Sequence, residues 1–310
     1  MYNMDKLYQA VADRGPVCIG LDTTVDYIPL GAVERANSPA EAIVAYNSAI
    51  IEATWDIAAC YKVQIAFYEA LGLEGLRAYA ETIRYIRSRG ALVIADIKRG
   101  DIAISAERYV QAHFSGDFEA DFVTLSPFMG MDTLEPWLTV AASSGKGAFV
   151  LVRTSNPGMR DFEYQELKSG RRFYEAVGDS LQALAERYMG AHGYGLFGAV
   201  VGAEPKSLEE RLEILQLRKK YDTLFFLSPG YGAQGGGAED AALLLRDGNG
   251  GVINASRSIL TAWSGQLASE GKPLLEANLD FAASSARNAA LAMQKSLLGA
   301  VKAGGVQRGG

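Results

Sequence analysis

Short apolar runs alternate along the chain with longer stretches that have helical periodicity. The apolar runs are Val17–Asp22, Ala58–Ile65, Ala91–Asp101, Asp121–Leu125, Gly147–Arg153, Leu196–Val201, Thr223–Leu227 and Gly251–Asn254. Continuous apolar runs of this length are typical of strands buried on both faces, as in a parallel sheet. The alternation therefore predicts an α/β fold in which helices cover a parallel sheet.

Helical stretches fill the intervals between these runs. They are residues 3–14, Ser38 to about Asp56, Tyr68–Arg89, Ile104–Phe114, Asp132–Ser144, Arg171–Met189, Ser207 to about Tyr221, Ala238–Arg246, and most of the chain from the last apolar run to about Ala303. Ser38-Pro39-Ala40-Glu41 and Ser207-Leu208-Glu209-Glu210 resemble capping boxes, which mark helix starts. Gly15-Pro16 is a helix stop signal.

Eight strand–helix units in roughly 250 residues are the pattern of a (β/α)8 TIM barrel, and an open doubly wound sheet is the alternative. No linker-like shift in composition divides the chain, so we expect one barrel domain over residues 1–310, with a disordered tail at 304–310. The longest irregular insertion, Ser155–Gly170, follows the fifth apolar run. Barrel enzymes carry their sites on that face, so we interpret the insertion as a lid or a binding loop.

Composition narrows the class of protein. Hydrophobic residues make up 49% of the chain, which is enough for a large core, and the net charge of −6 argues against nucleic acid as a partner. No apolar run approaches the ~18 residues of a membrane span, and the N-terminus lacks a signal-peptide core. Cys18 and Cys60 lie in apolar runs, which favours buried, reduced thiols. We therefore expect a cytoplasmic protein without a membrane partner.

Charged residues gather where the expected strands end. Asp96 and Lys98 point the same way because alternate residues of a strand share a face, whereas Asp101 lies beyond Gly100 and can turn elsewhere. Asp22 and Lys62 lie near the ends of the first two runs. Charges are costly to bury without purpose, and the C-terminal ends of barrel strands carry the chemistry. The alternatives are a structural Asp96–Lys98 ion pair and a helix-capping role for Asp22.

Two loops near the end of the chain indicate a phosphate site. The seventh run leads into a glycine-rich loop that contains Tyr231 and Gln234, and the eighth leads to Arg257. Glycines let backbone N–H groups converge on an anion, and an arginine can pair with phosphate through two hydrogen bonds. Barrels often bind phosphate with these two loops. The alternative is that the glycine-rich stretch is only a flexible turn.

Several motifs resemble one enzyme family. The segment Asp96-Ile97-Lys98-Arg99-Gly100-Asp101-Ile102 matches the D-x-K-x-x-D-[IV] signature of orotidine 5′-phosphate decarboxylases. The segments YKVQIAFYE, LVRTSNPG, LSPGYGAQGG and INASRSI resemble the longer bacterial branch of that family, so the resemblance covers nearly the whole chain. It implies a (β/α)8 barrel that converts orotidine 5′-phosphate to UMP without a cofactor or a metal. It also implies a homodimer whose subunits meet at the face that carries the active sites.

The resemblance implies a role for each matching residue. Lys98 would deliver a proton to C6 of the pyrimidine, Asp96 would face the substrate carboxylate, and Lys62 would belong to the same charged array. Asp101 and Ile102 would reach into the partner subunit's site. The implied substrate-binding residues are Asp22, Lys62, Ile102, Ser105, Thr154, Ser155, Tyr231, Gln234 and Arg257. Ser105 stands where the family often has Thr, and the choice between Thr154 and Ser155 as the main pyrimidine contact stays open.

The chemistry explains why such a site needs alternating charges. Loss of CO2 leaves an electron pair in the plane of the ring, where the ring cannot delocalise it well. A cation beside C6 stabilises that charge in the transition state, and the flanking Asp96 and Asp101 favour the charged form of Lys98. The competing interpretations are a Mg²⁺-dependent sugar-phosphate decarboxylase or lyase of the same barrel superfamily, and a non-catalytic barrel that binds nucleotide phosphates.

Overall fold

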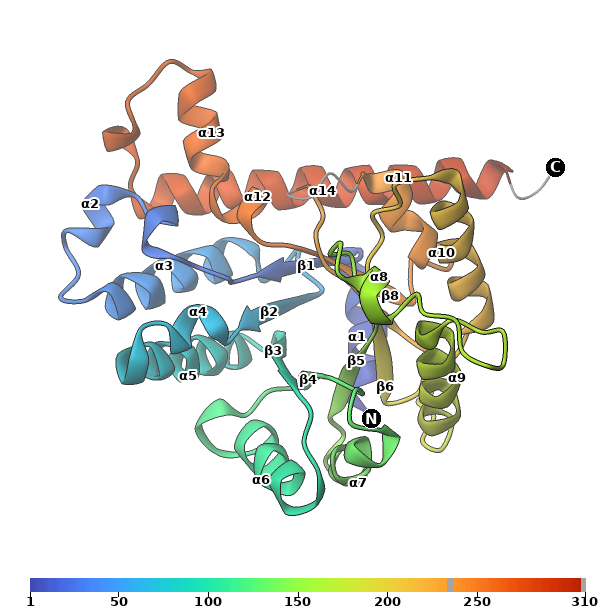
Figure 1. The fold of residues 1–310 in the computed structure, drawn as a ribbon. Coiled ribbons are helices and arrows are strands. Elements are labelled where there is room, and N and C mark those ends of the chain that lie inside the picture. Colours follow the sequence, from blue (N-terminus) through green and yellow to red (C-terminus); the bar gives the residue numbers. More distant parts are fainter. Residues whose placement is uncertain (233–236, 308–310) are drawn as a thin grey trace.

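The computed structural model describes residues 1–232 and 237–307, and in this part of the chain eight parallel strands close into a barrel (Figure 1). The strands are β1 Val17–Gly20, β2 Cys60–Gln64, β3 Leu92–Arg99, β4 Phe122–Leu125, β5 Gly147–Arg153, β6 Phe197–Val201, β7 Phe226–Ser228 and β8 Gly251–Ala255. Strand order follows the chain, and β8 pairs with β1 to complete the ring. The predicted (β/α)8 barrel is confirmed, and the open sheet is excluded.

Helices surround the strands (Figure 1). They are α1 Asn3–Arg14, α2 Leu30–Val33, α3 Pro39–Thr54, α4 Ala66–Glu69, α5 Gly72–Ser88, α6 Ala103–Phe114, α7 Glu135–Ser144, α8 Met159–Phe162, α9 Phe173–Ala185, α10 Leu208–Lys220, α11 Ala238–Ala241, α12 Arg257–Leu260, α13 Ala262–Ser269 and α14 Leu279–Gln307. Ser38 and Ser207 cap α3 and α10 by accepting from Glu41 N and Glu210 N, each over 3.2 Å. Both predicted helix starts are therefore confirmed.

Some predicted helical segments are divided into shorter elements in the structure. The stretch Tyr68–Arg89 is two helices, because Gly72 has φ of +65° and redirects the chain between α4 and α5. The predicted helix Ala238–Arg246 is shorter, since α11 ends at Ala241 and a 3-10 turn follows it. Helix α14 continues to Gln307, and the expected disordered tail at 304–310 stays a prediction. An established helix adds further turns at little cost. Residues 308–310 lie outside the described residues.

Two apolar layers hold the barrel together. The outer layer lies between the strands and the surrounding helices. The inner layer fills the barrel and includes Cys18 and Cys60, which are free thiols, as predicted. Met4, Leu7 and Val11 of α1 belong to the same inner cluster. Helix α1 therefore packs across the N-terminal end of the barrel and closes it, while the C-terminal ends of the strands remain available for a site.

No helix in the described part of the chain combines the length and the apolar character that a membrane span needs.

Candidate active site

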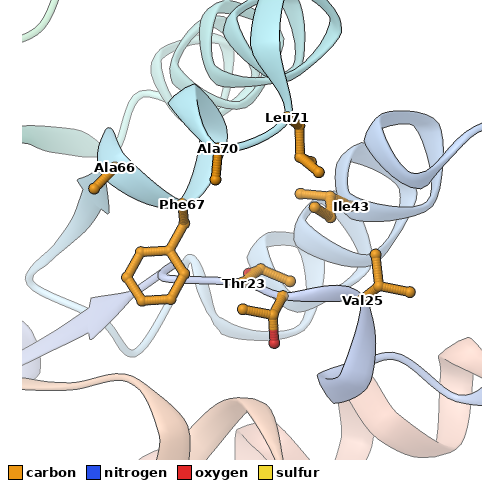
Figure 2. A pocket seen from close by; sticks show the side chains of 8 residues that line it. Thr23, Val25, Ile43, Ala66, Phe67, Ala70 and Leu71 are labelled. Carbon is orange, nitrogen blue, oxygen red and sulfur yellow. The ribbon is translucent and has the colours of Figure 1, made fainter.

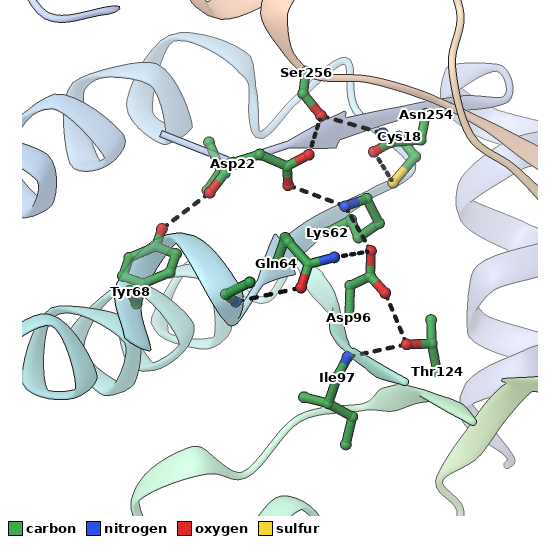
Figure 3. Close-up of polar contacts among 12 residues, drawn as sticks. Cys18, Asp22, Lys62, Gln64, Tyr68, Asp96, Ile97, Thr124, Asn254 and Ser256 are labelled. Atoms are coloured by element: carbon green, nitrogen blue, oxygen red, sulfur yellow. Dashed lines mark hydrogen bonds and ion pairs between the residues drawn. The ribbon is translucent and has the colours of Figure 1, made fainter. Parts of the chain in front are cut away.

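Four charged side chains alternate in sign at the C-terminal ends of β1, β2 and β3, and Figure 3 shows three of them, Asp22, Lys62 and Asp96. The Nζ atom of Lys62 lies 3.0 Å from Oδ1 of Asp22 and 3.0 Å from Oδ2 of Asp96. Nζ of Lys98 lies 2.6 Å from Oδ1 of Asp96. We call Asp22, Lys62, Asp96 and Lys98 the charged array. The structure thus brings together four residues that the sequence analysis placed at the ends of three strands.

The register of the sheet explains why these side chains meet. Gly20 pairs with Lys62, and Gln64 pairs with Asp96, so successive strands present their charges at nearly the same height in the barrel. A Cβ atom on Gly20 would lie 2.0 Å from Oγ of Ser256. Glycine at this position therefore leaves room for Ser256, whose hydroxyl donates to Oδ2 of Asp22 over 2.8 Å.

Burial and mutual attraction fix the charge states of the central pair. Asp96 and Lys62 are both buried. Burial alone would raise the pKa of Asp96, but the positive charges of Lys62 and Lys98 hold that pKa well below its usual range. Burial alone would lower the pKa of Lys62, but Asp22 and Asp96 hold it well above its usual range. Asp96 is therefore a carboxylate and Lys62 an ammonium at neutral pH.

Lys98 differs from Lys62 in its exposure. Its side chain is 46% exposed, against 5% for Lys62, and the array gives it one carboxylate partner where Lys62 has two. Its backbone is also unusual, because Lys98 has φ of +45° at the end of β3. Left-handed backbone is uncommon outside glycine and often marks functional sites. Lys98 thus places an ammonium group at the mouth of the barrel.

Two residues that the sequence analysis did not single out complete the surroundings of Asp96. Gln64 donates to Oδ2 of Asp96 over 3.1 Å, and Thr124 donates to Oδ1 over 2.8 Å. Gln64 stands two residues after Lys62 and shares its face of β2, which is a signal that could have identified it. Thr124 is the one polar residue of β4, between Val123 and Leu125.

Asp101, Ile102 and Ser105 do not join the array. In the described part of the chain no ion pair links Asp101 to Lys62 or Lys98; instead its carboxylate accepts from Ile102 N over 2.8 Å. Ile102 is 52% exposed, and Ser105 lies exposed in the first turn of α6. The segment after β3 therefore leads away from its own barrel mouth.

The insertion after β5 engages Thr154 and is anchored to α10. Glu163 accepts from Thr154 N over 2.8 Å and from Thr154 Oγ1 over 2.7 Å. Tyr164 donates to Glu213 of α10 over 2.7 Å and accepts from Nε of the buried Arg153 over 3.0 Å. These contacts fix the loop beside the end of β5 and hold the Thr154 side chain against Glu163.

The two loops expected to bind phosphate lie side by side. Tyr231 N donates to the carbonyl of Asn254 over 3.2 Å, which ties the loop after β7 to β8. Gly232 has φ of +78°, and a Cβ there would lie 3.4 Å from Oγ of Ser258. Arg257 begins α12 directly after β8. Gln234 falls outside the described residues.

An apolar cavity of about 320 Å³ lies beside the array (Figure 2). It is lined by Thr23, Thr24, Val25, Ile43, Ala66, Phe67, Ala70 and Leu71. Thr23 follows Asp22 in the chain, yet no charged side chain lines this cavity. Its lining suits apolar groups and does not suit a carboxylate or a phosphate.

The histidines lie away from the array. His113 is buried and stacks on Phe118, and His192 stacks on Tyr8 with ring centroids 4.2 Å apart. Among the described residues no three His, Cys, Asp or Glu side chains come together as a set that could hold a metal ion.

A closed (β/α)8 barrel with alternating carboxylates and ammonium groups at its C-terminal mouth has the architecture of a barrel enzyme with a charged site. The model of the orotidine 5′-phosphate decarboxylase / HUMPS family matches residues 15–270. The chain belongs to this family.

Individual relatives agree along nearly the whole chain. It is 48% identical over 297 residues to an orotidine 5′-phosphate decarboxylase of Clostridium perfringens (strain SM101 / Type A), covering 96% of this chain and 98% of the relative. The solved OMP decarboxylase of Leishmania donovani is 31% identical with a TM-score of 0.70, covering 95% of this chain and 99% of that one. A putative orotidine 5′-phosphate decarboxylase of Streptomyces avermitilis is 28% identical with a TM-score of 0.74, covering 94% and 95%.

Proposed function

We propose that the chain decarboxylates orotidine 5′-phosphate to UMP, the last step of pyrimidine nucleotide synthesis, with Lys98 as the proton donor and no metal or cofactor. The observation that carries this proposal is the charged array, in which buried Lys62 and Asp96 support an accessible ammonium on Lys98. Membership of the family and 48% identity to a curated decarboxylase support the same activity.

The proposed reaction breaks the bond between C6 and the carboxyl carbon. The bonding electrons stay on C6, CO2 leaves, and Nζ–H of Lys98 gives its proton to C6. A substrate carboxylate placed near Asp96 is repelled by it, and that repulsion disappears as neutral CO2 forms. Lys62 is held by two carboxylates, so Lys98 is the more mobile donor. Lys98 regains its proton from solvent because its side chain is partly exposed.

The other proposed site residues bind three parts of the substrate: the ribose, the pyrimidine and the phosphate. Asp22 and Lys62 bind the ribose hydroxyls, and Ser155 binds the edge of the pyrimidine. Thr154, whose hydroxyl donates to Glu163 over 2.7 Å, is the alternative pyrimidine contact. Tyr231, Gln234 and Arg257 bind the phosphate, with backbone N–H groups of the glycine-rich loop. Binding energy from the phosphate, far from C6, offsets the strain at the reacting carboxylate.

We also propose a cytoplasmic homodimer in which Asp101, Ile102 and Ser105 reach into the partner subunit's site, Asp101 touching the ribose. Support comes from exposed apolar side chains at the start of α6 and on the loop after β4, where Ile102 is 52%, Ile104 67% and Phe128 73% exposed. Contiguous exposed apolar residues are typical of protein interfaces. The free thiols Cys18 and Cys60 suit a reducing compartment.

The activity is tested by following the loss of orotidylate absorbance after addition of the purified chain in EDTA. We expect full turnover. Turnover that requires Mg²⁺ would favour a metal-dependent lyase, and tight UMP binding without turnover would favour a nucleotide-binding barrel.

The role of Lys98 is tested with Lys98→Ala. We expect turnover to fall by at least about 1,000-fold, because the variant loses both the cation beside C6 and the proton donor. The thermal midpoint and the affinity for UMP report whether the variant is folded. Near-normal turnover by folded Lys98→Ala would refute the assignment.

A further inference from the structure

Thr124 occupies an unusual position at the end of β4. Its side chain is buried, with 1% exposure, and its hydroxyl makes three hydrogen bonds. Oγ1 accepts from Ile97 N over 3.0 Å and donates to Oδ1 of Asp96 over 2.8 Å (Figure 3). It also accepts from Lys98 N over 2.9 Å. Every one of these bonds ends on the Asp96–Lys98 segment.

The pairing of β3 with β4 explains why a hydroxyl is needed there. Ala95 pairs with Val123, and the next pair is Arg99 with Leu125. Asp96, Ile97 and Lys98 therefore stand opposite Thr124 alone, which is a β-bulge. The bulge takes the Ile97 and Lys98 N–H groups out of the regular ladder, and unpaired buried N–H groups are costly. The Thr124 hydroxyl replaces the missing ladder acceptor for both.

The bulge also sets the direction of the Lys98 side chain. Residues two apart on a regular strand lie about 7 Å from each other, so their side chains run roughly parallel. Here the backbone of Lys98 is left-handed, with φ of +45°, and its Nζ lies 2.6 Å from Oδ1 of Asp96. Thr124 bonds both sides of that contact, the amide of Lys98 and the carboxylate oxygen of Asp96. It uses its one proton and both acceptor sites to do so.

We propose that Thr124 is a positioning residue for decarboxylation, holding the left-handed backbone of Lys98 and the plane of the Asp96 carboxylate in the geometry that proton delivery requires. The inference rests on the proposed roles of Lys98 and Asp96. Thr124 touches neither a reacting atom nor the substrate in this assignment. Its effect passes through the two groups that it bonds.

The test compares Thr124→Val, which keeps shape and loses the hydroxyl, with Thr124→Ser, which keeps the hydroxyl. We expect Thr124→Val to lower kcat for orotidylate by about 100-fold with KM changed only a few-fold, since an error of about 1 Å in a reacting group costs that much. Exchange of the C6 hydrogen of UMP in D2O uses the same proton transfer in reverse, so it should slow in parallel. Thr124→Ser should restore both rates to within about five-fold of the original.

Thr54→Val is the matched control. Thr54 is fully buried at the end of α3, where its hydroxyl donates to the carbonyl of Ile50 over 2.6 Å and contacts Tyr61 OH over 2.7 Å. Its loss should lower the thermal midpoint and leave kcat and C6 exchange unchanged. If Thr124→Val does not fold, Thr124→Cys serves instead, because a thiol of similar size is a weak hydrogen-bonding group.

The outcomes separate this inference from the proposed function. Folded Thr124→Val or Thr124→Cys with normal kcat and normal exchange would overturn the role of Thr124. Thr124→Ser as slow as Thr124→Val would overturn it too, because the methyl group would then be what matters. Lack of turnover by the unmodified chain, or activity of Lys98→Ala, would instead refute the proposed function.

Discussion

Asp96 is the residue on which the charged array depends. Its carboxylate accepts hydrogen bonds from Lys62 and Gln64 on one oxygen and from Lys98 and Thr124 on the other. A buried carboxylate is tolerated only when its oxygens are satisfied and opposite charges lie close. This saturation holds Asp96 ionised, so a substrate carboxylate that comes near it meets a fixed negative charge.

Arg257 is the residue through which the phosphate site can be tested. We expect Arg257→Ala to weaken binding of UMP by about 100-fold and binding of uridine only slightly, since a charge-assisted pair to phosphate is worth roughly 1.5–3 kcal/mol. Calorimetry with both ligands measures the difference. Arg246→Ala is the control, because Arg246 lies before β8, at the opposite end of the barrel, where it donates to the carbonyl of Asp222. Equal losses for UMP and uridine would remove Arg257 from the phosphate site.

At the residue scale, the sequence predicted the charged residues of the array but not the residues that hydrogen-bond to them. Lys62, Asp96 and Lys98 are detectable because a charge in an apolar strand is unusual. Thr124 gives a weaker signal, since threonine is common in strands and its importance comes from a bulge in the neighbouring strand. The contacts of Thr154 with Glu163 join residues nine apart in the chain and form only when the insertion folds back on β5, so the sequence did not predict them.

Helix α6 leads from the proposed interface segment into the core at His113. That ring is buried against Phe118, with ring centroids 6.1 Å apart. Burial, helped by the positive charge of Arg99, lowers the pKa of His113 to about 4. The pKa in the unfolded chain is about 6.5, so the folded state favours the neutral ring. The stability that this ring contributes is present above pH 6.5 and is lost as the pH falls towards 4.

The prediction for α6 follows from that difference in pKa. Between pH 7 and pH 5, the free energy of unfolding of the unmodified chain should fall by about 2 kcal/mol more than that of His113→Phe, which has no ring to protonate. Urea unfolding at both pH values measures it. His192→Phe is the control, since His192 is exposed and a phenyl ring can still stack on Tyr8. If His113→Phe and the unmodified chain lose stability equally, His113 is not the buried titrating group.

At the element scale, the sequence predicted helix boundaries correctly where a short local motif determines them. The N-caps Ser38 and Ser207 are where the sequence placed them. The break between α4 and α5 depends on the left-handed backbone of Gly72 and also on close packing, because a Cβ on Gly75 would lie 1.9 Å from the carbonyl oxygen of Tyr68. The sequence shows only that Gly72 and Gly75 lie within a helical pattern. It does not show the close contact at Gly75 or the turn at Gly72.

At the scale of the whole molecule, the proposed sharing of sites can be tested by mixing inactive subunits. We expect Asp101→Ala and Lys98→Ala each to be nearly inactive alone. Equal mixing after dissociation should restore about a quarter of the original activity, because half of the dimers are mixed and each has one complete site. The measurement is orotidylate turnover before and after mixing.

The control for mixing pairs Lys98→Ala with Asp96→Ala. Both residues belong to the array of one subunit, so their mixed dimer contains no complete site and should stay inactive. Recovery with this pair would point to contamination, and absence of recovery with Asp101→Ala would place Asp101 in its own subunit's site.

The position of helix α1 determines at which end of the barrel small molecules enter and leave. Its side chains Met4, Leu7 and Val11 complete the apolar filling of the barrel, so among the described residues the N-terminal end of the barrel is covered. Substrate, CO2, UMP and the water that reprotonates Lys98 must then share the C-terminal mouth. The proposed phosphate-binding residues Tyr231 and Arg257 follow β7 and β8 at that same end of the barrel.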